Sequence, residues 1–339
     1  MNERAAPPLA VTLGEPAGVG PDLVLTLFAA RGKTSLPPFV VFGQAGLLRT
    51  RAERLGLAVD VAPASPADAV SLFADALPVI EVEGLVPDKP GEPSQVSAHF
   101  VTEAIAEAVR ATLAGSCRGL VTGPIHKAVL YGAGFRYPGH TEYLAALCAN
   151  GGAPPKLPVM MLVHETLRAV PLTVHVPLSE VPRRVTRELL LETGRIVAHD
   201  LRTRFGIAEP SLALAGLNPH AGEKGTMGRE ELDLIGPAIA ELAFEGIRVE
   251  GPFPADTLFY PPHWRRYDAV IAMYHDQALI PIKTLAFDEA VNVTLGLPIM
   301  RTSPDHGTAF ELAGTGKALP ASFRAALQLA DRLTVSGAA

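Results

Sequence analysis

The chain has 339 residues, of which 48% are hydrophobic and 19% charged, and its formal net charge is −6 at pH 7. This composition is typical of a globular protein with a sizeable core, and it excludes a disordered chain and a basic surface for nucleic acid. No run approaches the ~20 apolar residues of a membrane span, the N-terminus does not resemble a signal peptide and there are two cysteines, so we expect a cytoplasmic protein.

Short β-rich runs alternate with longer helical patterns along the chain. The expected strands are 9–13, 38–42, 78–82, 119–123, 158–163, 169–176, 211–217, 268–274 and 290–295. The expected helices are 21–31, 44–56, 97–115, 126–134, 140–149, 179–205, 228–245 and 320–334. Several strands are apolar throughout, which is typical of parallel strands covered by helices on both faces. The alternation predicts an α/β protein with largely parallel sheets, and the Pro- and Gly-containing stretch 84–94 predicts an exposed loop.

Two glycine-containing segments follow expected strands. "TLGEPAGVGPDL" at 12–23 matches neither GxGxxG nor GxxxxGK[ST], so it predicts a tight loop near a site without identifying a ligand. "TGPIHKA" at 122–128 places Lys127 at the start of a helix, where its side chain faces either the site or the solvent.

Three histidines follow expected strands: His175 in "LTVHVPL", His220 in "LNPHAGE" and His275 in "AMYHDQ". Ligands of open α/β sheets gather outside the carboxyl ends of the strands, where three histidines can converge. Three imidazoles with one open position describe a catalytic metal site, and such sites accept zinc and other divalent ions. A single histidine on a strand also serves as a hydrogen-bonded structural residue, and Asp276 either orients a neighbouring ligand or caps a turn.

A set of polar residues suits an anionic ligand. Lys283, Asn292 and Arg301 lie within one later segment and border expected strands or turns. Two cations and an amide donor together suit a phosphate or a carboxylate. His140 and Thr141, in "PGHTEYL", stand at an expected helix start, where free N–H groups attract anions.

Together these motifs resemble the 4-hydroxythreonine-4-phosphate dehydrogenase family of vitamin B6 biosynthesis. They are "GEPAGVGPDL", "TGPIHKA", "GHTEYL", "LNPHAGE", "GPFPADTLF", "AMYHDQALIPIK" and "VNVTLGLPIMRTSPDHGTAFELAGTGKA", and the resemblance covers nearly the whole chain. The tail "HGTAFELAGTGKALP" also resembles the adenosine-binding segment of the isocitrate and isopropylmalate dehydrogenases, which bind NAD(P) without a classical Rossmann domain. The resemblance implies two α/β/α domains with the active site in the cleft between them. Residues 1–135 with 300–339 would form the first domain and residues 136–299 the second.

The resemblance also implies roles for individual residues. The divalent metal, which would be zinc, magnesium, cobalt or manganese, would be bound by His175, His220 and His275, one of them supplied by the partner chain of a homodimer. The implied substrate contacts are His140, Thr141, Lys283, Asn292 and Arg301. The implied cofactor contacts are His306, Gly307, Thr308 and Ala309, and the choice between NAD and NADP stays open. The candidates for the general base are Lys127, Asp256 and Asp276.

The implied reaction is the NAD(P)-dependent oxidation of 4-phosphohydroxy-L-threonine at C3, followed by decarboxylation to 3-amino-2-oxopropyl phosphate. A close alternative keeps the fold and oxidises threonate or erythronate 4-phosphate, or a dihydrodiol dicarboxylate. More distant alternatives are a metal-dependent hydrolase and a phosphate acyltransferase, and the adenosine-type tail argues against both. The cationic set favours a small phosphorylated substrate without deciding between an amino group and a hydroxyl at C2.

Overall fold

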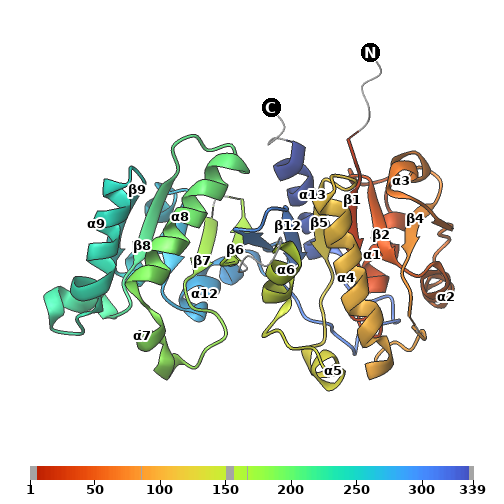
Figure 1. Cartoon of the computed structure of the whole chain (residues 1–339), viewed down its shortest axis with the longest axis horizontal. Helices are drawn as coiled ribbons and strands as arrows, with labels where there is room; N and C mark the ends of the chain where they lie inside the picture. The colour runs from red at the N-terminus through yellow and green to blue at the C-terminus, as the bar shows by residue number, and fades with distance from the viewer. Residues whose placement is uncertain (1–5, 85, 150–155, 166, 336–339) are drawn as a thin grey trace, which may run out of the picture. The chain divides into compact units, whose positions relative to one another are not determined.

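The computed structural model describes residues 6–84, 86–149, 156–165 and 167–335, and it divides into two compact units (Figure 1). The first unit combines Met1–Lys156 with Leu297–Val335, and the second is Leu157–Gly296. Residues 136–149, which we expected in the second part, belong to the first, so the division falls after residue 156 instead of near 135. The terminal residues 1–5 and 336–339, which we placed in the first domain, lie outside the described residues. None of the described helices combines the length and apolar character needed to cross a membrane.

The first unit is an α/β/α layer built on parallel strands that pair in the order β3-β4-β2-β1-β5-β12. Its strands are β1 (Leu9–Thr12), β2 (Phe39–Gly43), β3 (Val61–Pro63), β4 (Leu77–Glu81), β5 (Gly119–Thr122) and β12 (Arg301–Pro304). Its helices are α1 (Gly20–Ala29), α2 (Ala45–Leu55), α3 (Pro66–Leu72), η1 (Gln95–Ser97), α4 (Ala98–Leu113), α5 (Lys127–Gly132), α6 (His140–Cys148) and α13 (Ala321–Val335).

Helices cover both faces of these strands. α4 is amphipathic and buries Phe100, Ile105 and Val109 in one core, together with residues of α6 and the facing side of β1, β2 and β5. α13 packs against β12, β5 and β1 and also contacts α1. Because β1, β2 and β5 are buried along their whole lengths, their sequences are apolar up to the last residues of β1 and β5, Thr12 and Thr122.

The second unit contains a mixed sheet in the order β11-β6-β7-β10-β8-β9. β6 pairs antiparallel with β11 and β7, whereas β7, β10, β8 and β9 run parallel. Its strands are β6 (Val159–His164), β7 (Leu167–Pro171), β8 (Ser211–Ala215), β9 (Arg248–Phe253), β10 (Ala269–Ala272) and β11 (Val291–Leu295). Its helices are η2 (Leu178–Glu180), α7 (Val181–Arg184), α8 (Arg187–Thr203), η3 (Pro219–Gly225), η4 (Glu231–Ile235), α9 (Gly236–Phe244), α10 (Ala255–Leu258), α11 (Pro261–Trp264) and α12 (His275–Ala286).

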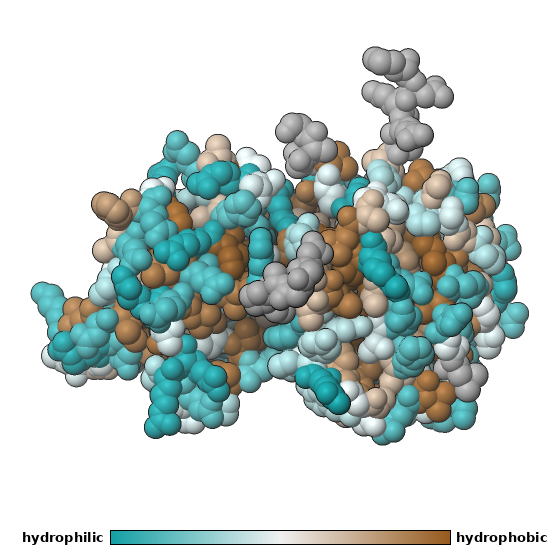
Figure 2. Space-filling model, in the orientation of Figure 1, coloured by the Kyte–Doolittle hydropathy of each residue, from teal (hydrophilic) through white to brown (hydrophobic). Residues whose placement is uncertain are grey.

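The helices of the second unit also divide between two faces. α12 buries Ala278, Leu279 and Ile282 in a core with apolar residues of β6, β7, β8 and β10. α8 contacts β6, β8 and β11 and packs beside α9. The outer side of α8 is largely hydrophilic, as Figure 2 shows, because its apolar residues face the sheet.

Several expected elements differ from the structure. The expected strand 169–176 ends at Pro171 in β7, so His175 lies in the segment after it. The expected helix 179–205 is interrupted, because Val185 is extended and the hydroxyl of Thr186 accepts a hydrogen bond from the N–H of Leu189 at 3.2 Å to begin α8. Lys283 lies inside α12, which we did not predict, instead of beside a strand.

Candidate active site

Arg301 is the central cation of the first unit. It pairs in register with Leu120 on β5, and its side chain reaches along β5 to Thr122, whose hydroxyl accepts from Nε at 3.1 Å and from Nη2 at 2.6 Å. Only 4% of Arg301 is exposed, and this burial lowers the pKa of its guanidinium to about 10. The group therefore stays charged at neutral pH, and a buried cation of this kind suits an anionic ligand.

His140 shares the surroundings of Arg301. It opens α6, its Nε2 is buried without a hydrogen-bond partner in the described structure, and its pKa is held well below 6.5. The largest cause is burial, and the positive charges of Arg301 and Lys127 act in the same direction. His140 is therefore a neutral imidazole near pH 7, with one ring nitrogen available to a ligand.

Lys127 and Thr141 complete this group, which we call the cationic cluster: Arg301, His140, Lys127 and Thr141. Lys127 is the first residue of α5, and its Nζ would lie 3.5 Å from a Cβ placed on Gly139, the residue before α6. Thr141 lies in the first turn of α6. Two cations, a neutral imidazole and the free N–H groups of a helix start are the donors that a phosphate group prefers.

Glu15 is a second buried polar group of the first unit, and sequence reasoning missed it. It follows β1, is 1% exposed and accepts from the N–H of Ala17 at 3.2 Å through Oε1. Its Oε2 is buried without a partner among the described residues, and burial raises the pKa of its carboxyl group. Buried polar atoms are nearly always hydrogen-bonded in native proteins, so Oε2 marks a place for a polar ligand. A glutamate beside Pro16 within the glycine-rich loop was the available signal.

The implied cofactor contacts form one loop packed against the glycine-rich loop. The carbonyl of Thr308 accepts from the N–H of Val19 at 3.0 Å, and a Cβ on Gly18 would lie 2.8 Å from the same carbonyl oxygen. Ala309 has a left-handed backbone with φ of 41°. The Nε2 of His306 is a further buried atom without a hydrogen-bond partner in the described part of the chain.

In the second unit, two of the three predicted metal ligands lie together. Parallel pairing of β7 with β10 continues beyond the strands, where the N–H and hydroxyl of Thr173 donate to the carbonyl of Met273 at 3.3 and 2.8 Å. This register places the rings of His175 and His275 with their centroids 5.8 Å apart. They line a pocket of about 300 Å³ that also includes Tyr274.

Asp276 orients one of these rings. Its Oδ1 lies 2.8 Å from Nδ1 of His275, which fixes the tautomer with a proton on Nδ1 and leaves the lone pair of Nε2 for a metal. Two adjacent imidazoles, one held by a carboxylate, are donors that fit a divalent metal ion. Asp256, another candidate base, is an exposed residue in the first turn of α10.

His220 lies in a different structural setting. It belongs to η3, where His220, Ala221, Gly222, Glu223 and Lys224 all have left-handed backbones with φ between 41° and 73°. Within the described ranges of the single chain, no group of three or more His, Cys, Asp or Glu side chains is placed to hold a metal. His175 and His275 are thus brought together by one chain, and His220 of the same chain does not complete a three-ligand group with them.

The buried carboxylate of Glu231 stabilises the left-handed loop around His220. This carboxylate is 4% exposed and accepts from the backbone N–H of Asn218 at 2.7 Å and from its amide Nδ2 at 3.0 Å. A Cβ on Gly222 would lie 2.5 Å from Oε2 of Glu231, so the loop approaches this carboxylate as closely as glycine allows. Sequence reasoning missed Glu231 because it lies thirteen positions after Asn218 with no motif linking them.

The other predicted substrate contacts of the second unit lie on or under α12. Lys283 lines a second pocket, of about 370 Å³, together with His275 and Phe287. Asn292 pairs in register with Leu162 of the core that α12 covers, so its side chain is on the face of the sheet next to that helix. His275, Lys283 and Asn292 therefore share one helix and the sheet face beneath it.

Comparison with known proteins agrees with these motifs. The family model described as pyridoxal phosphate biosynthetic protein PdxA matches residues 35–330. A 4-hydroxythreonine-4-phosphate dehydrogenase of Methylorubrum populi is 54% identical over 328 residues, which cover 96% of this chain and 94% of that protein. The crystal structure of a 4-hydroxythreonine-4-phosphate dehydrogenase from Klebsiella pneumoniae is 36% identical with a TM-score of 0.85, covering 97% of this chain and 99% of that one. A β-decarboxylating dehydrogenase from Thermococcus kodakarensis, 14% identical with a TM-score of 0.51 over 97% of this chain and 84% of its own, shares the fold alone.

The expected α/β fold and the expected family are both confirmed by these matches. The chain belongs to the PdxA family of pyridoxal phosphate biosynthetic proteins.

Proposed function

We propose that this chain is an oxidoreductase that oxidises 4-phosphohydroxy-L-threonine at C3 with NAD(P), and that loss of CO₂ then gives 3-amino-2-oxopropyl phosphate for pyridoxal phosphate biosynthesis. The observation that carries this proposal is the buried guanidinium of Arg301 beside the neutral His140 and the ammonium of Lys127, in a chain of the PdxA family. A phosphate end of the substrate would satisfy these donors and the start of α6 together.

The second unit would supply a metal site and further substrate contacts. His175 and His275 are the metal ligands of one chain, and Asp276 keeps His275 in the tautomer that offers Nε2. When bound, the divalent ion would supply Lewis-acid stabilisation of negative charge on the C3 oxygen. Lys283 lines a pocket with His275, and Asn292 lies on the sheet face that α12 covers, so both would contribute substrate contacts.

We propose that His220 reaches the metal site of a partner chain in a homodimer. Exposed apolar side chains flank the two histidine pockets, with Leu178 68%, Ile280 62% and Phe287 72% exposed, and a partner would cover them. The test mixes two inactive variants, His220→Ala and His275→Ala. If the metal site is shared, mixed dimers contain one intact set of ligands and activity returns, whereas a site formed within one chain stays inactive in every mixture.

The chemistry requires one hydride transfer and one proton transfer. A bound nicotinamide would supply the acceptor for the hydride that leaves C3, and a base of the protein would take the hydroxyl proton. Of the three candidates, Asp276 is engaged by His275 and Asp256 is exposed in α10, whereas Lys127 lies in the cationic cluster. A charged Lys127 that binds the phosphate cannot also accept this proton, so the base stays open among the three candidates. The C1–C2 bond would then break with release of CO₂, the C3 ketone would accept the electrons as an enolate, and a proton taken up at C2 would give the aminoketone phosphate.

The cofactor would bind at the loop of His306, Gly307, Thr308 and Ala309. Gly307 offers a clean test, because a Cβ placed there meets no atom within 4 Å. A Gly307→Val variant should fold with an unchanged melting temperature, and its KM for the nicotinamide cofactor should rise because the new side chain occupies ligand space. An unchanged cofactor KM would exclude this loop as the adenosine site.

A substrate panel with NAD and NADP tests the whole proposal. Reduced nicotinamide should form with 4-phosphohydroxy-L-threonine, with one CO₂ and one three-carbon aminoketone phosphate for each cofactor reduced. Reduction only with threonate or erythronate 4-phosphate, or only with a dihydrodiol dicarboxylate, would overturn the vitamin B6 assignment. The dephosphorylated substrate is the matched control, since it lacks the group that the cationic cluster binds.

A further inference from the structure

Arg51 is a fully buried arginine on the apolar side of α2. It is 0% exposed and follows Leu47 and Leu48, which face the same core. A guanidinium without water must be surrounded by acceptors, because an unpaired buried charge destabilises the fold strongly. Its partners therefore show what the position is built to hold.

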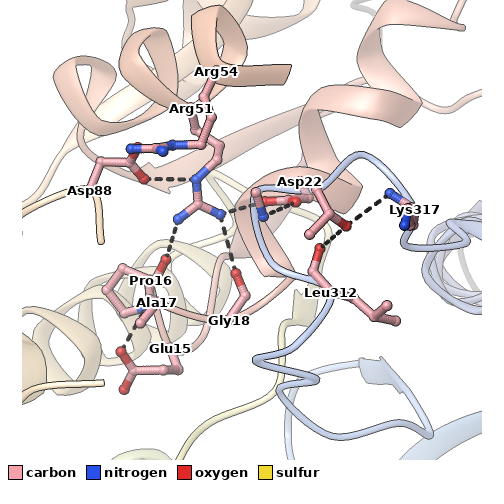
Figure 3. Close-up of polar contacts among 12 residues, drawn as sticks. Glu15, Pro16, Ala17, Gly18, Asp22, Arg51, Arg54, Asp88, Leu312 and Lys317 are labelled. Atoms are coloured by element: carbon pink, nitrogen blue, oxygen red, sulfur yellow. Dashed lines mark hydrogen bonds and ion pairs between the residues drawn. The ribbon is translucent and has the colours of Figure 1, made fainter. Parts of the chain in front are cut away.

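The acceptors of Arg51 come from two separate loops and from the first turn of α1 (Figure 3). Nη2 donates to the carbonyl of Pro16 at 2.9 Å and Nη1 to the carbonyl of Gly18 at 3.3 Å, both in the glycine-rich loop after β1. Nη1 also pairs with Asp22 in the first turn of α1. Nε donates to Oδ1 of Asp88 at 2.7 Å, in the loop before η1.

The same network extends to the candidate cofactor loop. The second oxygen of Asp22 accepts from the N–H of Gly314 at 2.6 Å. The described residues of 84–94 form a loop without buried residues, as expected, and two contacts anchor it here: the side chain of Asp88 is 5% exposed and the N–H of Gly91 donates to the carbonyl of Ala17 at 2.8 Å. Three segments far apart in the sequence are thus linked: Arg51 contacts the glycine-rich loop and Asp88 directly, and Asp22 connects them to the loop that contains Gly314.

Two of these segments each contain a buried polar atom without a hydrogen-bond partner in the described structure. The glycine-rich loop presents Oε2 of Glu15, and the loop from 305 to 317 presents Nε2 of His306. Both loops lack regular secondary structure, so their geometry depends on side-chain contacts such as those of Arg51. A planar group with five donors can fix several carbonyl and carboxylate oxygens at once, which the ammonium of lysine cannot do.

We infer that Arg51 is a positioning residue for nucleotide binding: it holds the glycine-rich loop against the loop 305–317 in the geometry that accepts the cofactor. The inference rests on the proposed use of NAD(P). Arg51 contacts no reacting atom. It keeps the two loops ordered before the cofactor binds, so that binding does not include the entropic cost of ordering them.

The test compares Arg51→Lys with Arg49→Lys, a matched change on the exposed side of the same helix, where Arg49 donates to the carbonyl of Val61. In the ligand-free Arg51→Lys protein, amide hydrogen exchange should quicken at least tenfold in 14–20 and 305–317 and stay unchanged in α8. Its KM for the nicotinamide cofactor should rise at least tenfold, and its KM for the phosphorylated substrate should change less than twofold. The Arg49→Lys protein should match the wild type in all three measurements.

The outcomes separate this inference from the proposed function. If the wild type reduces neither NAD nor NADP with any substrate of the panel, the proposed function fails, and calorimetric titration of the wild type and Arg51→Lys with NAD and NADP then decides the inference. Faster exchange with an unchanged cofactor KM, or equal rises in both KM values, would mean that Arg51 has a purely structural role. If Arg51→Lys does not fold, Asp88→Asn, which weakens the contacts of this carboxylate with Arg51 and Arg54 and leaves the guanidinium of Arg51 in place, is measured instead with the same decisive outcomes.

Discussion

The neutral state of His140 makes the stability of the protein depend on pH in a predictable way. Its pKa in the folded chain is well below the ordinary 6.5, chiefly because of burial and then because of Arg301 and Lys127. As pH falls below 6.5, the imidazole of His140 takes up a proton in the unfolded chain but stays neutral in the folded chain. The stabilisation is therefore fully present above pH 6.5 and is lost progressively below it.

The magnitude follows from the unfolded imidazole alone. If the folded ring takes up no proton between pH 7.5 and 5.5, the free energy of unfolding falls by about 1.4 kcal/mol across that interval, because protonation of an imidazole with a pKa of ~6.5 favours the unfolded chain by that amount. Substituting His140→Gln removes the titrating group. The difference in stability between the wild type and this variant should therefore shift by about 1.4 kcal/mol over the same interval.

Urea unfolding of both proteins at pH 5.5, 6.5 and 7.5 measures this difference. The control is His199→Gln, which removes an exposed imidazole of α8 and should leave the pH dependence of the wild type almost unchanged. If His140→Gln and the wild type lose stability in parallel from pH 7.5 to 5.5, His140 titrates alike in the folded and unfolded chains, and the argument from burial is refuted.

Three further changes test the rest of the site. Thr122→Val should lower the free energy of unfolding by about 1.5–3 kcal/mol in urea titrations, because the buried guanidinium of Arg301 loses its hydroxyl acceptor; a loss indistinguishable from zero would contradict the role of that contact. Asp276→Asn should weaken zinc binding about 10- to 100-fold by calorimetry without lowering the melting temperature, since this carboxylate is mostly exposed and acts by orienting His275; unchanged zinc affinity would leave Asp276 as a turn residue. Burial raises the pKa of the Glu15 carboxyl group, so the stabilising contribution of this group is complete below pH 4.5 and is lost as pH rises through the folded pKa. Glu15→Gln, which keeps the side chain neutral, should therefore raise the free energy of unfolding more at pH 7 than at pH 4. An equal effect at both pH values would show that the carboxyl group titrates normally.

The placement of His175 and His275 could be predicted from the sequence, because each follows a buried strand and β7 and β10 are parallel neighbours. The helix that begins at His275 was harder to predict. Pro281 lies inside it and is unfavourable in a helix interior, and the helix follows the apolar strand directly, so the sequence offers little to mark where it begins. As a result, Lys283 was expected beside a strand and lies within α12. Strand β9 was missed for a related reason, because its residues are only partly buried and lack an apolar run.

Buried polar networks were the least predictable part of the site. Arg51 gave one signal, since it follows Leu47 and Leu48 at the spacing of a helix face that should be apolar. Its acceptors at Asp22 and Asp88 are distant in sequence and share no motif with it. Periodicity reports which side of an element is buried, but the pairing of buried charges depends on how loops return over the sheet.

The left-handed run at His220 has a consequence for engineering this protein. A left-handed backbone costs roughly 1–2 kcal/mol for each residue that carries a Cβ, and four of the five residues in the run carry one. Replacing Ala221 with glycine would relieve part of that cost, so the variant should melt at a higher temperature. The same change would widen the range of directions open to the neighbouring imidazole. Selection for thermal stability alone would therefore favour glycine at this position, and it would give a protein with a higher melting temperature in which the orientation of His220 is less restricted.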